Sequence, residues 1–202
     1  MPSVKTLTPI LGGRYFHIFN RGINKQSIFF ESKNYDYFLK LIEEFLIEYT
    51  DVFAYCLMSN HFHLVLKVKD VIFKEKDDIL ADEEQIGKIV TNQLRRLFIT
   101  YSMAINKQEK RTGNFFDRSF KRLEITSQEY LEYVIFYTHF NPEKHGVITN
   151  FRKYKYSSYK AILASAKTNI DREFVIDLFG GKDEFLNYHN VMHEEKENVV
   201  LE

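Results

Sequence analysis

The chain has 202 residues, 45% of them hydrophobic and 28% charged, and its 28 basic side chains balance its 28 acidic ones. This composition is that of a globular domain and excludes a disordered or collagen-like chain. The single cysteine, Cys56, excludes an intrachain disulfide framework and predicts a reducing, cytoplasmic environment. The sequence shows neither a secretory signal nor an apolar stretch near the roughly 20 residues of a membrane-spanning helix, so we expect no membrane contact.

The first part of the chain alternates strand and helix patterns. Residues 14–20 are aromatic-rich and predict a strand. Apolar residues at three- and four-residue spacing predict an amphipathic helix over residues 34–48. Two strand-like runs at residues 52–58 and 61–68 predict a β-hairpin. Residues 71–84 have no clear period and predict a mobile loop.

The second part continues the alternation. A long helix is predicted over residues 85–106 and a strand over residues 115–125. Ser127 is a good N-cap for the next helix, which we expect Pro142 to end. Short helical patches follow at residues 158–164, 172–178 and 183–188, and then a charged tail that we expect to be frayed. This order predicts an α+β sandwich with a mostly antiparallel sheet and helices on one face.

A pair of histidines lies in the second strand of the predicted hairpin. Because alternate side chains of a strand share a face, His61 and His63 point away from the apolar face that contains Phe62. Two imidazoles on one strand can bind one divalent ion, and a hydrogen-bonded pair without metal fits the pattern equally well. The spacing identifies no third ligand. A structural zinc site is disfavoured because the chain has only one cysteine.

The helix predicted from residue 127 is rich in tyrosine. At about 100° per residue, Tyr133, Tyr137 and Asn141 fall within one arc of this helix. The apolar positions on another side of the helix can dock on the sheet. An aromatic stripe that covers the core is the ordinary explanation of such spacing. A stripe of tyrosines that ends in asparagine is more polar than packing requires.

The two stretches together resemble the HUH single-tyrosine transposases, in particular the REP-associated tyrosine transposases. HUH denotes His, a bulky hydrophobe and His, which His61-Phe62-His63 matches. Other segments are similar to the family's motifs and follow in the same order: Asn20-Arg21-Gly22, Ala54-Tyr-Cys-Leu-Met58 with Asn60, Asn141-Pro-Glu-Lys-His-Gly146, and Tyr156-Ser-Ser-Tyr159. The resemblance ends near residue 160. We therefore expect a transposase-like domain over residues 1–160 and a helical extension and tail over residues 161–202.

The resemblance implies a ferredoxin-like fold and an enzyme that cleaves and rejoins single-stranded DNA at hairpin-associated sites. Tyr137 matches the nucleophile, and Tyr133 is the reserve candidate. His61, His63 and Asn141 match the positions that hold a divalent cation, Mg²⁺ or Mn²⁺, although relatives in mobile elements usually have glutamine in place of Asn141. Such an ion would neutralise phosphate charge while the tyrosine forms a 5′-phosphotyrosine intermediate. Because some relatives act as dimers, the resemblance also allows a homodimer.

The neutral total charge conceals an uneven distribution. Residues 1–87 carry a net charge of −3, residues 88–160 of +8 and residues 161–202 of −5. A basic middle segment is compatible with single-stranded or hairpin DNA as the partner. The candidate DNA-binding side chains, with interleaved aromatics that can stack on unpaired bases, are Arg95, Arg96, Lys110, Arg111, Arg118, Lys121, Arg122, Arg152, Lys153 and Lys155.

Two other functions fit the same residues. A domesticated, non-catalytic protein would bind hairpin DNA or RNA on the same sheet. A metal-dependent hydrolase would use the histidine pair without a covalent tyrosine. The intact set of candidate catalytic and metal-binding residues favours the transposase-type enzyme, because a decayed copy is expected to lose some of them. His17 on the first strand is structural or lies next to the phosphate, and we prefer the structural role. The sequence assigns no function to the other histidines: His139, His145, His189 and His193.

Overall fold

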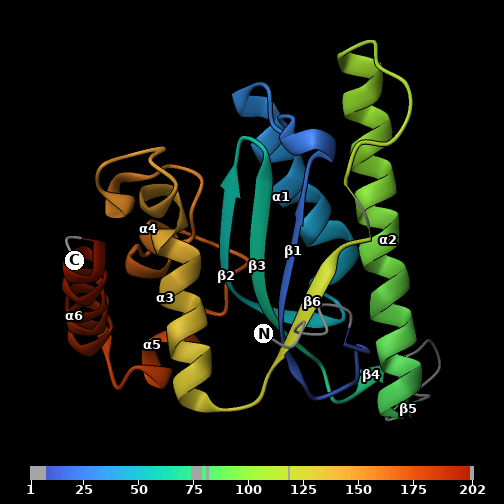
Figure 1. Ribbon diagram of the computed structural model, residues 1–202. Coiled ribbons are helices and arrows are strands. Elements are labelled where there is room, and N and C mark those ends of the chain that lie inside the picture. Colours follow the sequence, from blue (N-terminus) through green and yellow to red (C-terminus); the bar gives the residue numbers. More distant parts are fainter. Residues whose placement is uncertain (1–7, 74–78, 81, 118, 201–202) are drawn as a thin grey trace.

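The computed structural model describes residues 8–73, 79–80, 82–117 and 119–200. Its centre is a four-stranded antiparallel sheet in the order β2-β3-β1-β6 (Figure 1). The strands are β1 (Tyr15–Arg21), β2 (Thr50–Met58), β3 (His61–Val68) and β6 (Lys121–Ile125). Helix α1 (Ser32–Leu46) joins β1 to β2, and helix α2 (Glu83–Gln108) joins β3 to β6. This is the split β-α-β arrangement, and the predicted ferredoxin-like α+β fold is confirmed.

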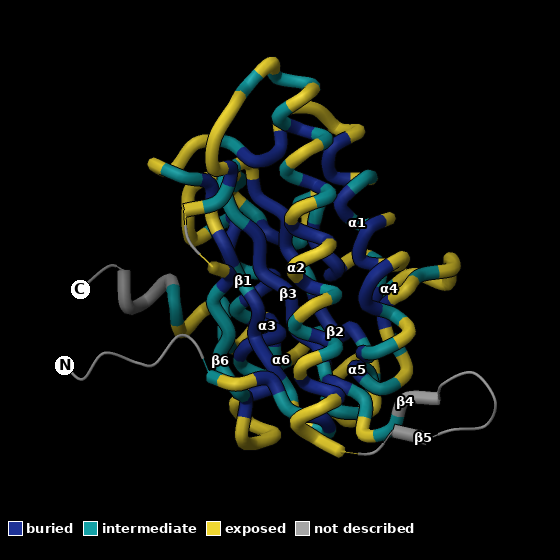
Figure 2. The backbone as a smooth tube through the Cα atoms, turned by 90° about the vertical axis from the view of Figure 1, so that its right-hand side faces the viewer, coloured by how far each residue is buried: buried dark blue, intermediate teal, exposed yellow. Residues whose placement is uncertain are grey.

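Helices α1 and α2 cover one face of the sheet. The ring centroid of Phe62 in β3 lies 5.1 Å from that of Phe38 in α1 and 5.4 Å from that of Phe98 in α2. All three side chains are buried. Tyr101 of α2 is also fully buried, where its hydroxyl donates to the Ile28 carbonyl oxygen over 2.7 Å. Figure 2 shows buried residues along the strands and along the inner sides of the helices. The apolar spacing in the sequence therefore identified this core.

Helix α3 (Gln128–Lys144) packs on the opposite face of the sheet, so the expectation of helices on one face holds only for α1 and α2. The helix begins as predicted, because the Ser127 hydroxyl accepts a hydrogen bond from the Tyr130 backbone N–H. Its buried residues include Leu131, Ile135 and Thr138, the apolar side expected from the sequence. Alternation along β3 could not place this helix, since the histidine side of a strand can face either water or another layer.

The structure corrects two predictions about the ends of helices. Pro142 lies inside α3, which continues to Lys144, because a proline in the last turn removes only one hydrogen bond near an end that already has unpaired groups. The predicted frayed tail is also wrong, since α6 (Lys182–Val200) extends well beyond residue 188. Between α3 and α6 lie the short elements η2 (Phe151–Lys153), α4 (Tyr159–Leu163) and α5 (Arg172–Leu178).

Two further segments differ from their predicted structure. Within the predicted loop at residues 71–84, β4 (Ile72–Phe73) and β5 (Ile79–Leu80) pair with each other, and residues 74–78 and 81 lie outside the described part. The strand predicted over residues 115–125 begins only at Lys121. Phe115 and Phe120 are both buried although they are an odd number of residues apart, which is incompatible with one regular strand that buries a single face.

Candidate functional site

The two candidate ligand histidines lie at the start of β3, on the face that α3 covers. His63 is buried between β1 and α3: its Nδ1 is 2.8 Å from Nε2 of His17, and its ring centroid is 5.9 Å from that of Tyr137. His61 is half-buried, and its ring lies 5.3 Å from that of His63 at an interplanar angle of 82°. His17, which we expected to be structural, therefore contacts the site by holding His63.

The hydrogen bonds of these two rings involve their Nδ1 atoms and not their Nε2 atoms. The Asn60 side-chain oxygen only accepts, so His61 donates to it from Nδ1 over 2.6 Å and keeps the lone pair on Nε2. A His63 tautomer that donates from Nδ1 to His17 keeps its Nε2 lone pair in the same way. Ligand histidines in metal sites commonly show this pattern, in which the second nitrogen is held by a neighbouring group. The two imidazoles therefore fit a divalent cation.

The protonation state of the histidines also fits metal binding. Burial lowers the pKa of His17 to about 4, and burial together with the neighbouring His145 and Arg21 side chains lowers the pKa of His61 to about 4. Burial also lowers the pKa of His63 well below its ordinary value. All three rings are neutral at neutral pH, which is the form that coordinates a metal ion.

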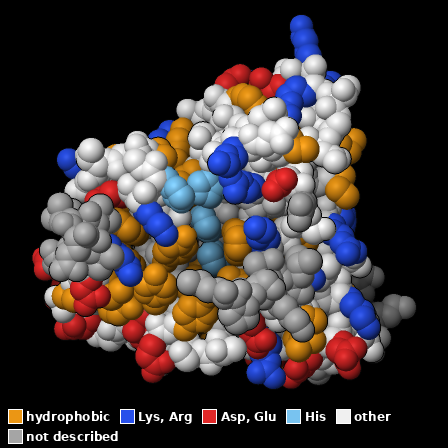
Figure 3. All heavy atoms as spheres, viewed as in Figure 1, with side chains coloured by type: hydrophobic (Ala, Val, Ile, Leu, Met, Phe, Trp, Pro, Cys, Tyr) orange, Lys and Arg blue, Asp and Glu red, His pale blue; other side chains and the backbone are white. Residues whose placement is uncertain are grey.

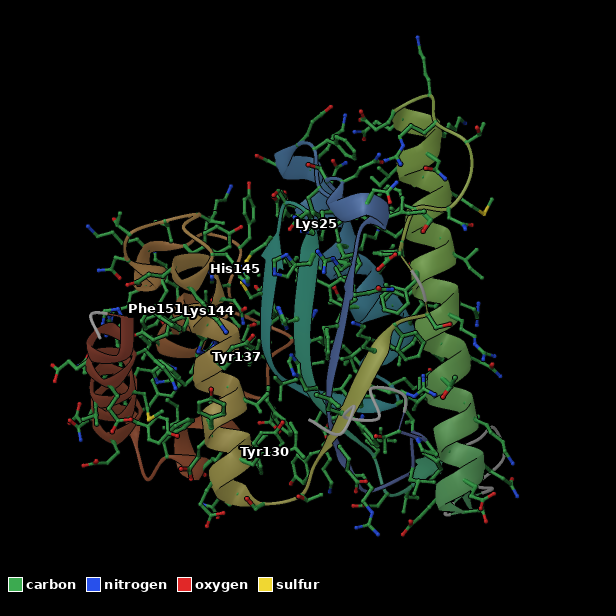
Figure 4. All side chains as sticks on the ribbon, viewed as in Figure 1. Lys25, Tyr130, Tyr137, Lys144, His145 and Phe151 are labelled. Atoms are coloured by element: carbon green, nitrogen blue, oxygen red, sulfur yellow. The ribbon has the colours of Figure 1, made fainter. Side chains whose placement is uncertain are left out.

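Tyr137 of α3 faces the histidines of the sheet. Its ring meets those of His63 and His17 edge to face, with centroids 5.9 Å and 6.3 Å away. The Lys144 ammonium lies 4.6 Å from the Tyr137 ring centroid, and its nitrogen donates weakly to the phenol oxygen over 3.4 Å. Figure 4 shows Tyr137, Lys144 and His145 along the side of α3 that faces the sheet.

Tyr133, the reserve nucleophile, lies one turn away from this cluster. Its ring stacks on that of Tyr137 at 6.2 Å, and the Lys196 ammonium of α6 lies 5.5 Å from its centroid. Tyr137 lines the cavity beside the histidines, whereas Tyr133 is not among the lining residues. The position of the two side chains therefore favours Tyr137.

A cavity of about 420 Å³ opens over the histidines. Figure 3 shows the pale-blue histidine side chains in this hollow with Lys and Arg side chains around them. The charged side chains in its lining include three basic groups and one carboxylate: Arg21, Lys25, Lys121 and Asp117. Sequence reasoning missed Arg21 and Lys25 as site residues, although Arg21 lies within a motif that carries the family resemblance.

Asn141, the third predicted ligand, is buried and does not line this cavity. Its side-chain nitrogen donates to the Tyr137 carbonyl oxygen over 2.6 Å, while its side-chain oxygen is buried without a hydrogen-bond partner among the described residues. In the part of the chain that the structure describes, no three His, Cys, Asp or Glu side chains are grouped so as to hold a metal ion. The role of Asn141 stays a prediction.

The structure brings some of the predicted DNA-binding residues to the site. Lys121 lines the cavity directly. Arg95 and Arg122 line a second hollow of about 280 Å³, which adjoins the cavity because both are lined by Asn20. These three basic side chains therefore line two hollows that share Asn20, and Arg122 also donates from Nε to the Thr8 carbonyl oxygen over 2.6 Å.

Other predicted DNA-binding residues lie farther away or already have partners. Arg111 donates to the Gln26 side-chain oxygen over 2.8 Å, and Arg152 donates to that of Asn190 on α6 over 2.7 Å. Arg118 lies outside the described residues. The remaining candidates are exposed and do not line the cavity: Arg96, Lys110, Lys153 and Lys155.

Comparisons with known proteins bear on the fold. Among the described helices, none is long and apolar enough to cross a membrane. Family models gave no match to the sequence, and neither did the curated proteins. A solved structure of a REP-associated tyrosine transposase bound to a REP hairpin matches with a TM-score of 0.54, at 13% identity, over 83% of this chain and 94% of that chain. The chain thus has the fold of a REP-associated tyrosine transposase, and at the level of the fold this confirms the resemblance seen in its motifs.

Proposed function

We propose that this protein is a transposase-type enzyme that cleaves and rejoins single-stranded DNA at hairpin-associated sites. The observation that carries the proposal is the contact between Tyr137 and His63, because it combines a nucleophile and a metal-binding group in one cavity. The similar solved structure supports hairpin DNA as the partner, since that transposase is bound to a REP hairpin. A basic cavity suits a polyanionic substrate.

In the proposed reaction, the Tyr137 phenol oxygen attacks a backbone phosphorus atom. A phosphorus–oxygen bond to the tyrosine forms and the bond to the 3′ oxygen breaks. The phenol releases its proton, and the departing 3′ oxygen takes one up and becomes a hydroxyl. The number of phosphoester bonds is unchanged, so a 3′ hydroxyl can reverse the step and rejoin a strand without a high-energy cofactor.

The side chains around Tyr137 would support this step. A phenol is a weak nucleophile while it keeps its proton, and the Lys144 ammonium beside it would stabilise the negative charge that develops on its oxygen. Mg²⁺ or Mn²⁺ on Nε2 of His61 and His63 would polarise the phosphate and stabilise the leaving oxygen. His17 would keep the His63 ring in the orientation that exposes Nε2.

The direct test is formation of a covalent adduct. The full chain is incubated with a single-stranded DNA that contains a hairpin, with Mg²⁺ or Mn²⁺, and the products are separated on a denaturing gel. We expect a protein band that carries the fragment on the 3′ side of the cut through its 5′ phosphate, together with a released 5′ fragment that ends in a 3′ hydroxyl. Tight hairpin binding without any adduct would contradict the proposed reaction and would support the non-catalytic binding protein instead.

The basic lining gives a second test. Lys25→Gln combined with Lys121→Gln is expected to weaken hairpin DNA binding and to reduce the slope of log K against log salt concentration by about 1.4, because each lost phosphate contact on a single strand removes about 0.7. Fluorescence anisotropy at several salt concentrations measures both effects. Lys33→Gln combined with Lys182→Gln removes the same charge away from the cavity and should leave the slope unchanged. Equal slopes in both double variants would place the DNA elsewhere.

A further inference from the structure

We propose that His145 is the third metal ligand of this site, in the role that the motifs suggest for Asn141. The inference rests on the proposed function, because it takes His61 and His63 as the holders of a divalent cation. His145 immediately follows α3 and lines the cavity together with both histidines. The family resemblance gives this position no function.

The arrangement of the rings supports this role. The His145 ring centroid is 5.1 Å from that of His61 at an interplanar angle of 84°, nearly the same relation as the 5.3 Å and 82° between His61 and His63. An ion bound at about 2.1 Å from a ring nitrogen lies roughly 3.2 Å from that ring's centroid, so two rings that share an ion at an angle of roughly 90–109° have centroids roughly 4.5–5.2 Å apart. Both the His63 ring and the His145 ring therefore lie near the separation from His61 that a shared ion requires.

The chemistry of His145 suits a ligand. An imidazole is the commonest metal ligand among protein side chains. Partial burial and the neighbouring Lys144 and Arg21 charges lower the pKa of His145. Its backbone forms the C-cap of α3, whose last carbonyl groups place partial negative charge near a bound cation. Asn141, by contrast, is buried outside the cavity lining, and its side-chain amide is bonded to its own helix.

Two observations define what binding would require. The described residues contain no ready group of three ligands, so the rings must converge when the ion arrives. The His145 side chain is exposed, and its ring can turn without disturbing the core. The basic residues of the cavity repel a cation, so metal affinity measured without DNA is expected to be modest and to rise when DNA phosphates are present.

Mn²⁺ titrations of the full chain without DNA test the inference. Electron paramagnetic resonance measures free Mn²⁺, and spin-echo modulation from ¹⁴N counts the coordinated imidazoles. We expect His145→Ala to weaken Mn²⁺ binding by at least about tenfold, since even the loss of groups that only orient ligands costs 10- to 100-fold, and to remove one imidazole signal. Asn141→Ala tests the alternative ligand directly: if His145 and not Asn141 coordinates the ion, this variant keeps both the affinity and the imidazole count.

The results separate this inference from the proposed reaction. It is overturned if His145→Ala binds Mn²⁺ like the wild type with the same imidazole count, or if Asn141→Ala alone loses binding. Failure of the wild type to bind Mn²⁺ also overturns it. The adduct assay on the same proteins tests the reaction independently. Three coordinated imidazoles without an adduct would refute the reaction and keep the metal site. A metal-dependent adduct together with unchanged Mn²⁺ binding by His145→Ala would keep the reaction and refute His145 as a ligand.

Discussion

Tyr137→Phe is expected to abolish the covalent protein–DNA adduct, with a loss of at least about a thousandfold in its rate of formation. Phenylalanine keeps the edge-to-face contacts with His63 and His17 but lacks the oxygen that would attack phosphorus. The cavity keeps its shape and its basic lining, so binding of uncut hairpin DNA is expected to stay close to that of the wild type. Denaturing gels measure the adduct, and anisotropy measures the binding.

Tyr133→Phe is the matched control, because it makes the same change one turn earlier on α3. This variant should form the adduct at nearly the wild-type rate, since Tyr133 stacks on Tyr137 but does not line the cavity. Loss of the adduct in Tyr133→Phe and not in Tyr137→Phe would identify the reserve tyrosine as the nucleophile. Adduct formation at the wild-type rate in both variants would exclude a tyrosine of this helix.

The sequence predicted the parts of the site that depend on local periodicity. Alternation along β3 placed His61 and His63 opposite Phe62, and the contacts of Phe62 with α1 and α2 confirm the division. Helical spacing placed Tyr137 away from Leu131, which is buried. These predictions succeeded because a strand has a period of two and a helix one of 3.6, whatever the rest of the chain does.

The remaining parts of the site depend on tertiary structure. Arg21 reaches the site because the antiparallel register of β1 and β3 places it opposite His61, forty residues away. Lys25 follows in a short turn where its φ is 60°, a conformation that no local pattern in the sequence indicates. His145 arrives because α3 crosses the histidine face of the sheet. Periodicity shows which face of a helix is apolar. It does not show on which side of the sheet the helix packs.

The C-terminal helix shows the same limit. Its sequence is charged and suggested fraying, yet His189 of α6 is fully buried against α3. His189 donates from Nδ1 to the Phe185 carbonyl oxygen over 2.8 Å, so its Nε2 accepts the hydrogen bond from His139 Nδ1 over 3.0 Å. His139 Nε2 in turn accepts from the Ser158 hydroxyl over 2.8 Å. This series of hydrogen bonds between neutral groups connects α6 to α3 and α3 to Ser158, which lies beside β2.

The buried, neutral histidines in this series of hydrogen bonds predict a strong loss of stability in acid. Burial lowers the pKa of His189 to about 3 and that of His139 well below its ordinary value of 6.5. Below pH 6.5 the unfolded chain therefore binds protons that the folded chain excludes. The free energy of unfolding is fully present above about pH 6.5 and falls as the pH decreases toward the folded pKa values, by about 1.4 kcal/mol per pH unit for each such histidine.

Urea unfolding followed by circular dichroism at pH 7.5, 6.5, 5.5 and 4.5 measures this effect. His17 and His61, with pKa values lowered to about 4, add to this loss of stability in acid. Burial raises the pKa of Asp51, and this one carboxyl group therefore acts in the opposite direction. Domains are typically stable by about 5–15 kcal/mol, so several buried histidines suffice to unfold this one between roughly pH 5 and 4. Unchanged stability down to pH 4.5 would contradict the buried neutral histidines.

His189→Gln separates the helix contact from the histidines of the site. The glutamine side-chain oxygen can still accept from His139 Nδ1 but does not titrate, so the pH dependence should decrease by about one proton while the remaining slope comes from the other buried histidines. Because α6 holds α3 through this bond, acid is expected to displace the helix that presents Tyr137 along with the global loss of stability. Adduct formation near pH 5 should accordingly recover in part in His189→Gln, which a loss caused only by protonation at His61 and His63 would not allow.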